Sequence, residues 1–263
     1  MNRQVFDELL ALKQRDTDMR SRLLQEGKLY GDYAPEMQQV HRENAKRLDE
    51  IIAKHGWPGV SLVGLEGCRA AWLIAQHSIC IPDLQRKFLA LLAKAAEDGD
   101  APKTQVAFLT DRIRYNESKP QVYGTVLDWN ERGELSCEVE DPANLDVRRK
   151  EVGLALYQDD LERHRNEVKF EGGKPPEDFA EYKRKGHEWA RSVGWIKRHN
   201  ESNVSPSQRR TMLPRLMPLV LCFWFFVARQ SGTSGPITDY AGVYKPIVPL
   251  LILHSSNAAF CLK

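Results

Sequence analysis

The stretch AAWLIAQHS, residues 70–78, indicates a helix that is built for burial but ends on polar groups. It carries no Asp, Glu, Lys or Arg, and every turn is apolar until Gln76 and His77. A buried amide or imidazole needs hydrogen-bond partners, because leaving one unsatisfied costs roughly 1–3 kcal/mol. Two interpretations follow. These side chains bond to nearby backbone carbonyls, or they form one wall of a polar site.

Helical patterns surround this stretch on both sides. Apolar spacing and Gly or Pro breakers predict helices over residues 4–26, 35–55, 66–79, 82–97 and 102–116. QVYGTVLDW (121–129) and SCEVE (136–140), joined by NERGEL, then predict a β-hairpin. Residues 144–191 return to highly charged helix, expected to form a peripheral arm, with EGGKPPED (171–178) as a break. The predicted fold class is mainly α, a helical domain with a small β-hairpin followed by a charged helical extension.

Three parts are expected along the chain. Residues 1–152 form a helical core domain with the hairpin, residues 153–210 a charged helical extension, and residues 211–263 an atypical apolar tail. The tail holds five charged residues in 53, far fewer than the rest of the chain. Its uncharged run at 216–228 has 13 residues, short of the roughly 20 that span a bilayer. A membrane anchor, a buried or disordered appendage and a translated shifted reading frame all stay open for it.

Bulk properties exclude several classes of protein. The chain is 42% hydrophobic and 28% charged, which is ordinary for a soluble globular protein with a sizeable core. A net charge of +2 predicts no nucleic-acid partner. Five scattered cysteines without a CxxC pattern indicate neither a disulfide framework nor a structural zinc site. The N-terminus lacks the pattern of a signal peptide, so a cytoplasmic location is expected.

Polar residues interrupt the apolar face of the helix predicted over 35–55. Met37, His41, Asn44, Leu48 and Ile51 follow a helical series and share one face. His41 and Asn44 are therefore expected either to point inward or to mark the edge of a narrow stripe.

Two later segments offer further polar groups. Asp111 and Arg112 are adjacent on a helix and point about 100° apart, so they either form a solvated surface pair or take separate partners. In the predicted strand, a period of two places Gln121, Tyr123 and Thr125 on one face, which is either solvent-exposed or part of a site. Gly124 within that strand indicates a bulge or the close approach of a backbone or ligand.

These motifs also carry a resemblance. HGWPGVSLVG, AAWLIAQHS, LTDRI and KPQVYGT resemble the successive motifs of a bacterial family of domains of unknown function, over about residues 5–152. The resemblance implies a fold unit and a shared site without implying a reaction. The segment after residue 152 departs from the pattern.

Two functions from different classes are consistent with these residues. The first is an enzyme acting on a small anionic substrate, with His41 or His77 as acid or base, Asp111 orienting a histidine, and Arg112 binding a carboxylate or phosphate. The substrate-binding set is Asn44, Gln76, Arg112, Gln121, Tyr123 and Thr125. The second is a non-catalytic module that binds a ligand or a protein, in which the polar groups are structural.

No cofactor is indicated by a motif. Two histidines and a carboxylate are the donors of an iron or zinc site, but no HxxxH or HxD spacing supports one, so a divalent metal is the less favoured variant. The expected partner is a small polar or anionic ligand. A protein partner stays open, with the charged arm 144–191 as its interface in the second function. A membrane contact would have to involve residues 216–228.

Overall fold

The computed structural model describes residues 1–29 and 33–196. These residues form eight α-helices, two short 3₁₀ helices and one hairpin. The α-helices are α1 (Arg3–Gln25), α2 (Pro35–His55), α3 (Val60–His77), α4 (Pro82–Glu97), α5 (Lys103–Asn116), α6 (Leu145–Glu151), α7 (Tyr157–Phe170) and α8 (Phe179–Val193). The mainly helical fold with a hairpin is confirmed. The expected tail at 211–263, with its run at 216–228, lies outside the described residues.

The ends of the first helices follow from local sequence. The side chain of Asn2 accepts a hydrogen bond from the Val5 amide at 3.2 Å and caps α1. Prolines stand at the first positions of α2 and α4, where a missing amide hydrogen costs nothing. Helix α3 begins at Val60, earlier than expected, because it continues through a kink at Gly64, whose φ is +70°.

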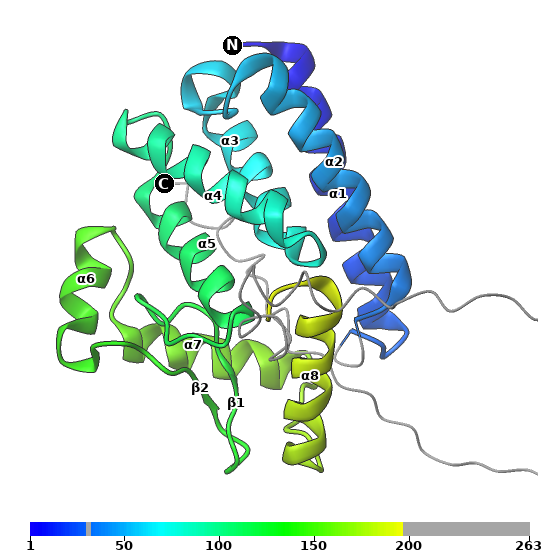
Figure 1. Cartoon of the computed structure of the whole chain (residues 1–263), viewed down its shortest axis with the longest axis vertical. Coiled ribbons are helices and arrows are strands. Elements are labelled where there is room, and N and C mark those ends of the chain that lie inside the picture. Colours follow the sequence, from blue (N-terminus) through cyan, green and yellow to red (C-terminus); the bar gives the residue numbers. More distant parts are fainter. Residues whose placement is uncertain (30–32, 197–263) are drawn as a thin grey trace, which may run out of the picture. The chain divides into compact units, whose positions relative to one another are not determined.

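Helices α1 to α5 enclose the main core (Figure 1). Leu9, Leu48, Ile74, Phe88 and Leu109 are almost fully buried there. Burying each such side chain stabilises the fold by roughly 1.5–3 kcal/mol. In α2, the whole series from Met37 to Ile51 that contains His41 and Asn44 is buried, so the inward stripe is confirmed.

The hairpin is shorter than the sequence pattern predicts. Strand β1 (Asp128–Trp129) pairs antiparallel with β2 (Leu135–Ser136), and residues 122–127 form a loop. The expected alternation of faces over 121–127 is therefore wrong. The physical reason is that amides of this loop donate to the side chain of Asp111 instead of to a neighbouring strand.

The charged segment after the hairpin folds back onto the helical core. Leu161, Val168 and Tyr182 form a second small core with the hairpin. The indole of Trp195, just after α8, donates a hydrogen bond to the carbonyl of Ile79 at 2.7 Å, and Ala190 belongs to the main core. The expected peripheral arm therefore packs on both cores.

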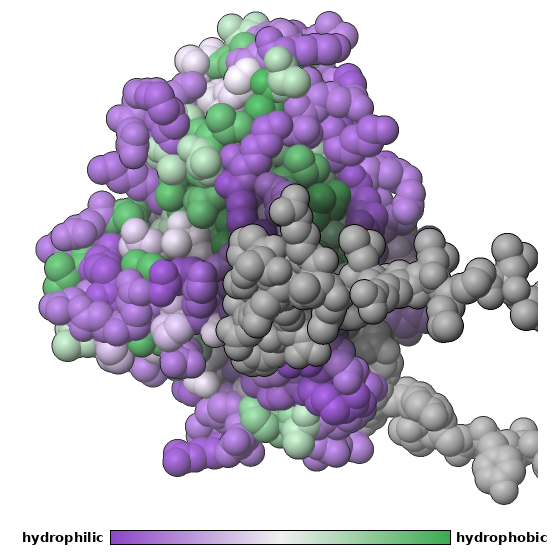
Figure 2. All heavy atoms as spheres, viewed as in Figure 1, coloured by the Kyte–Doolittle hydropathy of each residue, from purple (hydrophilic) through white to green (hydrophobic). Residues whose placement is uncertain are grey.

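The surface carries many charges. Hydrophilic side chains surround the hydrophobic ones on the face drawn in Figure 2. Among the described residues, no helix combines the length and apolar character that crossing a bilayer requires.

Candidate functional site

Three helices bring a carboxylate and two imidazoles together. Oδ2 of Asp16 on α1 lies 2.6 Å from Nδ1 of His77 on α3. The same oxygen lies 3.1 Å from Nε2 of His41 on α2. The two imidazole rings are 5.0 Å apart between centroids, and all three side chains are buried. We call Asp16, His41 and His77 the histidine cluster.

Electrostatics define the protonation of the Asp16–His77 pair. Burial raises the pKa of Asp16, but its close contacts with the imidazoles of His77 and His41 outweigh burial, and the pKa falls well below its usual range. Burial lowers the pKa of His77, against the opposing effect of Asp16. Asp16 is therefore ionised and His77 neutral near pH 7. The proton of His77 is on Nδ1, where it is donated to Asp16, and its Nε2 carries a lone pair.

Nε2 of His77 has no hydrogen-bond partner in the described part of the chain. A neutral imidazole held by a carboxylate through Nδ1, with a free Nε2, is the arrangement of a general base. The lone pair is thus not engaged by any other group of the described residues.

Tyr33 determines the state of the second imidazole. Burial raises the pKa of Tyr33 well above its usual value, so its hydroxyl stays protonated. That hydroxyl lies 2.5 Å from Nδ1 of His41 and donates to it, which leaves the proton of His41 on Nε2. Nε2 faces Asp16 at 3.1 Å but outside good hydrogen-bond geometry.

Arg112 on α5 adds an unpaired positive charge. Only 4% of the residue is exposed, and its guanidinium has no hydrogen bond or ion pair with the residues described. Burial lowers its pKa to about 10, so it remains charged at neutral pH. Its charge is close enough to His77 to lower the pKa of that imidazole further. The solvated Asp111–Arg112 pair that the sequence left open is not observed.

Asp111 fixes the loop that follows α5. Its two carboxylate oxygens accept hydrogen bonds from the amides of Val122, Tyr123 and Thr125 and from the Thr125 hydroxyl, at 2.8–3.2 Å. Asp111 makes no hydrogen bond with either cluster histidine among the residues described, and Asp16 contacts His77 instead. A catalytic role of Asp111 stays a prediction.

The remaining substrate-binding candidates make internal bonds. Gln121 closes the same loop, since its amide nitrogen donates to the Val126 carbonyl at 2.7 Å and its oxygen accepts from the Val126 amide at 2.9 Å. Asn44 donates to the Leu12 carbonyl at 3.0 Å, and Gln76 donates to the Phe108 carbonyl at 3.4 Å. The side-chain oxygens of Asn44 and Gln76 are buried without a partner in the described residues. The structure thus brings His41 and His77 together and holds Gln121 and Thr125 in a separate loop network.

Two members of the site were missed by sequence reasoning. Asp16 lies at the spacing i, i+7, i+14 with Leu9 and Leu23, and all three are buried on one face of α1. A charged residue at the centre of an apolar stripe was the available signal. Tyr33 precedes α2 and had no comparable signal.

The histidine cluster could also hold a metal ion. The ligand atoms of Asp16, His41 and His77 all lie within 4.8 Å of one another. Two imidazole nitrogens and a carboxylate oxygen suit Zn²⁺ or Fe²⁺.

Comparison with known proteins identifies a family but no activity. The model of a family of unknown function (DUF6624) matches residues 3–166. No curated protein and no solved structure matches the chain.

Proposed function

The chain belongs to the family of unknown function DUF6624, and we propose that it binds a small anionic ligand at Arg112 and acts on it with His77 as a general acid–base. One observation carries the proposal. Arg112, whose buried Nε has no hydrogen-bond partner among the described residues, is near enough to His77 to lower the pKa of that imidazole, and Nε2 of His77 is likewise buried without a partner there.

The guanidinium of Arg112 would be stabilised by a bound anion. A buried charge without a partner is destabilising by several kcal/mol, and proteins pair such charges or bind a counter-ion. The nearest acid in sequence, Asp111, has both oxygens engaged by the loop. A carboxylate or phosphate of the ligand supplies the missing charge, and the planar fork of arginine binds either one through two parallel hydrogen bonds.

The Asp16–His77 pair supplies the chemistry. Nε2 of His77 accepts a proton from a ligand group, and the imidazolium that forms is stabilised by the ionised Asp16 at Nδ1. The proposed reaction class is a proton transfer on an anion held by Arg112, and Nε2 returns the proton in the second half of the cycle.

Anion binding can be measured without knowing the natural ligand. Calorimetric titration with methylphosphonate is expected to show binding to the full chain and no binding to Arg112→Met. Arg184→Met is the matched control, because Arg184 is exposed and pairs with Glu181 on the surface of α8. Equal binding by all three proteins would contradict the proposed anion site.

The acid–base role has its own readout. Nitrogen NMR of labelled histidines is expected to show the proton of His77 on Nδ1 in the free protein. It is further expected to show a higher pKa for His77 once methylphosphonate adds negative charge nearby. A binding module without acid–base function predicts no change in the His77 signals on titration.

A metal centre at the histidine cluster is a second candidate, favoured by the convergence of its three ligand atoms. It predicts one equivalent of Zn²⁺ or Fe²⁺ in the protein, lost in Asp16→Asn and kept in Asp18→Asn. The acid–base proposal predicts instead that treatment with a chelator leaves methylphosphonate binding unchanged.

A further inference from the structure

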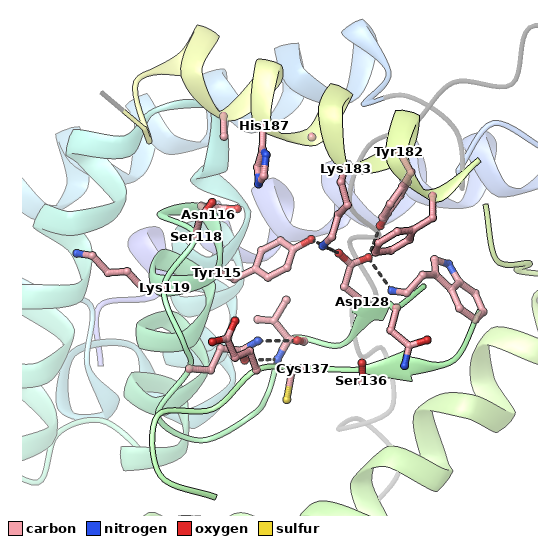
Figure 3. Close-up of a pocket in the computed structure, with 18 of the residues that line it drawn as sticks. Tyr115, Asn116, Ser118, Lys119, Asp128, Ser136, Cys137, Tyr182, Lys183 and His187 are labelled. Atoms are coloured by element: carbon pink, nitrogen blue, oxygen red, sulfur yellow. Dashed lines mark hydrogen bonds and ion pairs between the residues drawn. The ribbon is translucent and has the colours of Figure 1, made fainter. Parts of the chain in front are cut away.

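A cavity of about 500 Å³ lies between α8, the end of α5 and the hairpin (Figure 3). This volume is in the range of sites that bind small organic molecules. Its walls are rich in aromatic rings, which come from Trp129 next to the hairpin turn and from Phe179, Tyr182 and Trp189 on α8. Flat aromatic walls favour a flat apolar ligand.

Two nitrogen atoms at this cavity have no hydrogen-bond partner. Nδ2 of Asn116, in a residue only 6% exposed, and Nε1 of Trp189 are both buried and unpartnered among the residues described. A buried N–H that lacks an acceptor is destabilising by about 1–3 kcal/mol. Neither nitrogen atom is itself accessible from the cavity, so an acceptor on the ring of a ligand would satisfy these groups once the side chains of the wall shift toward it.

The charges around Asp128 in the cavity wall are neutralised by the protein itself. Asp128 accepts hydrogen bonds from the hydroxyls of Tyr115 and Tyr182, and Lys183 pairs with it at 3.0 Å. In Figure 3, Tyr115 and Lys183 both point toward Asp128. This part of the wall therefore supplies a polar, already satisfied surface. Glu131 and Glu138 also line the cavity and form no ion pair with the residues described.

The cavity adjoins the proposed anion site through α5. Asn116 follows Arg112 by four residues, so the two side chains are neighbours on one helix face. Tyr115 and Asp128, which line the cavity, are close enough to Arg112 to raise its pKa, although burial outweighs their effect. A ligand lying along α5 could thus present its anionic group to Arg112 and its body to the cavity.

We infer that the cavity binds the flat ring of the anion whose charged group Arg112 pairs, so that the ligand is an aromatic or heteroaromatic anion with an acceptor on its ring. This inference rests on the proposed function, because it assigns the uncharged part of the same ligand. Helix α8 lies beyond residues 3–166, the segment that matches the family. The aromatic wall of α8 therefore lies outside the segment that matches the family.

Gly186 offers a position from which the cavity can be filled. It lines the cavity from the middle of α8, where leucine is a better helix former than glycine. Gly186→Leu is therefore expected to fold and to occupy the space of the ring. Gly186→Ala is the matched control, since it makes the same helical change with little added volume.

Calorimetric titration of the full chain with three probes tests the inference. Phenylphosphonate carries a ring and an anion, methylphosphonate carries only the anion, and benzamide carries a ring with an uncharged acceptor. In the unmodified chain and in Gly186→Ala, we expect phenylphosphonate to bind at least about tenfold more tightly than methylphosphonate. In Gly186→Leu, we expect the two phosphonates to bind with about equal affinity. Benzamide binding is expected to survive Arg112→Met and to be lost in Gly186→Leu.

The outcomes separate the two proposals. Binding of methylphosphonate with no gain from the ring, or a gain that persists in Gly186→Leu, would overturn the ring site and leave the anion site standing. Benzamide binding without methylphosphonate binding would overturn the anion site and support the ring site. If Gly186→Leu loses helix content by circular dichroism, Trp189→Leu, which removes an unpartnered N–H and an aromatic wall, gives the second test with the same expected losses.

Discussion

The carboxylate of Asp16 lies 2.6 Å from Nδ1 of His77, although 61 positions separate the two residues in the chain. Asp16 comes from the first helix and His77 from the last turn of the third, so their contact requires α1 and α3 to pack in one register. The pair therefore reports both on the fold of the first three helices and on the state of the proposed base.

Replacement of Asp16 by Asn is expected to destabilise the protein by about 3–5 kcal/mol, because it removes one partner of a buried, hydrogen-bonded pair. The free energy of unfolding from urea titration measures this. Asp18→Asn is the matched control, since Asp18 is exposed on the same helix and accepts a hydrogen bond only from Gln14 among the bonds described. A similar loss in both variants would show that helix charge, rather than the buried pair, is responsible.

The helices could be predicted because their signals are local. Pro35 and Gly56 mark the two ends of α2, and the spacing from Met37 to Ile51 shows which face is buried. That spacing left two alternatives for His41 and Asn44, an inward position or the edge of a narrow stripe, and the structure shows the inward one. Periodicity gives the face of a helix but not the residue opposite it, and so the partnership of His41 and His77 with Asp16 could not be derived.

In the loop at 121–127, by contrast, the local sequence pattern predicted the wrong structure because a tertiary contact determines the backbone. Its alternating β-branched and aromatic residues favour a strand. The decisive partner is Asp111, a charged side chain 11 to 14 positions away, and its hydrogen bonds to Val122 and Thr125 hold the backbone in a loop. A tertiary hydrogen bond of this kind leaves no trace in periodicity.

Gly124 in that loop is expected to tolerate no side chain. Its φ is +64°, and an added Cβ would lie 3.1 Å from the sulfur of Cys137 and 3.2 Å from the ring of Tyr157. Gly124→Ala combines backbone strain of roughly 1–2 kcal/mol with this crowding. Gly56→Ala gives the strain alone, because its φ is +74° and nothing lies within 4 Å. Thermal unfolding should therefore show a larger loss for Gly124→Ala, and equal losses would contradict the close contact.

Acid is expected to destabilise the protein in two stages. Burial lowers the pKa of His77 in the folded state, so below its unfolded value of 6.5 the unfolded chain binds more protons and stability falls. The depressed pKa of Asp16 adds stability that is present above the unfolded value of 3.8 and is lost as the pH falls below it. His164, whose pKa burial also lowers, contributes to the first stage.

Urea titrations between pH 8 and pH 5 measure the first stage. His77→Gln should show a smaller loss of stability over this range than the unmodified chain, and His187→Gln, at an exposed position, should show the same loss as the unmodified chain. An unchanged pH dependence in His77→Gln would contradict a neutral, buried His77.

Two buried arginines provide the sharpest contrast. Arg149 is fully paired, since it donates to the carbonyls of Tyr123 and Ala155 and forms an ion pair with Asp160 at 2.5 Å. Arg149→Met removes one of the two arginine partners of the Asp160 carboxylate, the other being Arg163, and leaves the carbonyls of Tyr123 and Ala155 without this donor. It is expected to destabilise the protein by about 3–5 kcal/mol. Arg112→Met removes a charge that has no partner in the described residues, so in anion-free buffer it should be neutral or stabilising by about 1–4 kcal/mol.

Added methylphosphonate should make the unmodified chain more stable than Arg112→Met, the reverse of the order expected in anion-free buffer. The unmodified chain gains stability with anion concentration by mass action, about 2.7 kcal/mol at a concentration 100 times the dissociation constant, while Arg112→Met gains none. Thermal unfolding in a concentration series of methylphosphonate measures the effect, with Arg184→Met expected to follow the unmodified chain. If Arg112→Met instead destabilised the anion-free protein as strongly as Arg149→Met, the guanidinium would be a structural group, and the anion site would have to be placed elsewhere.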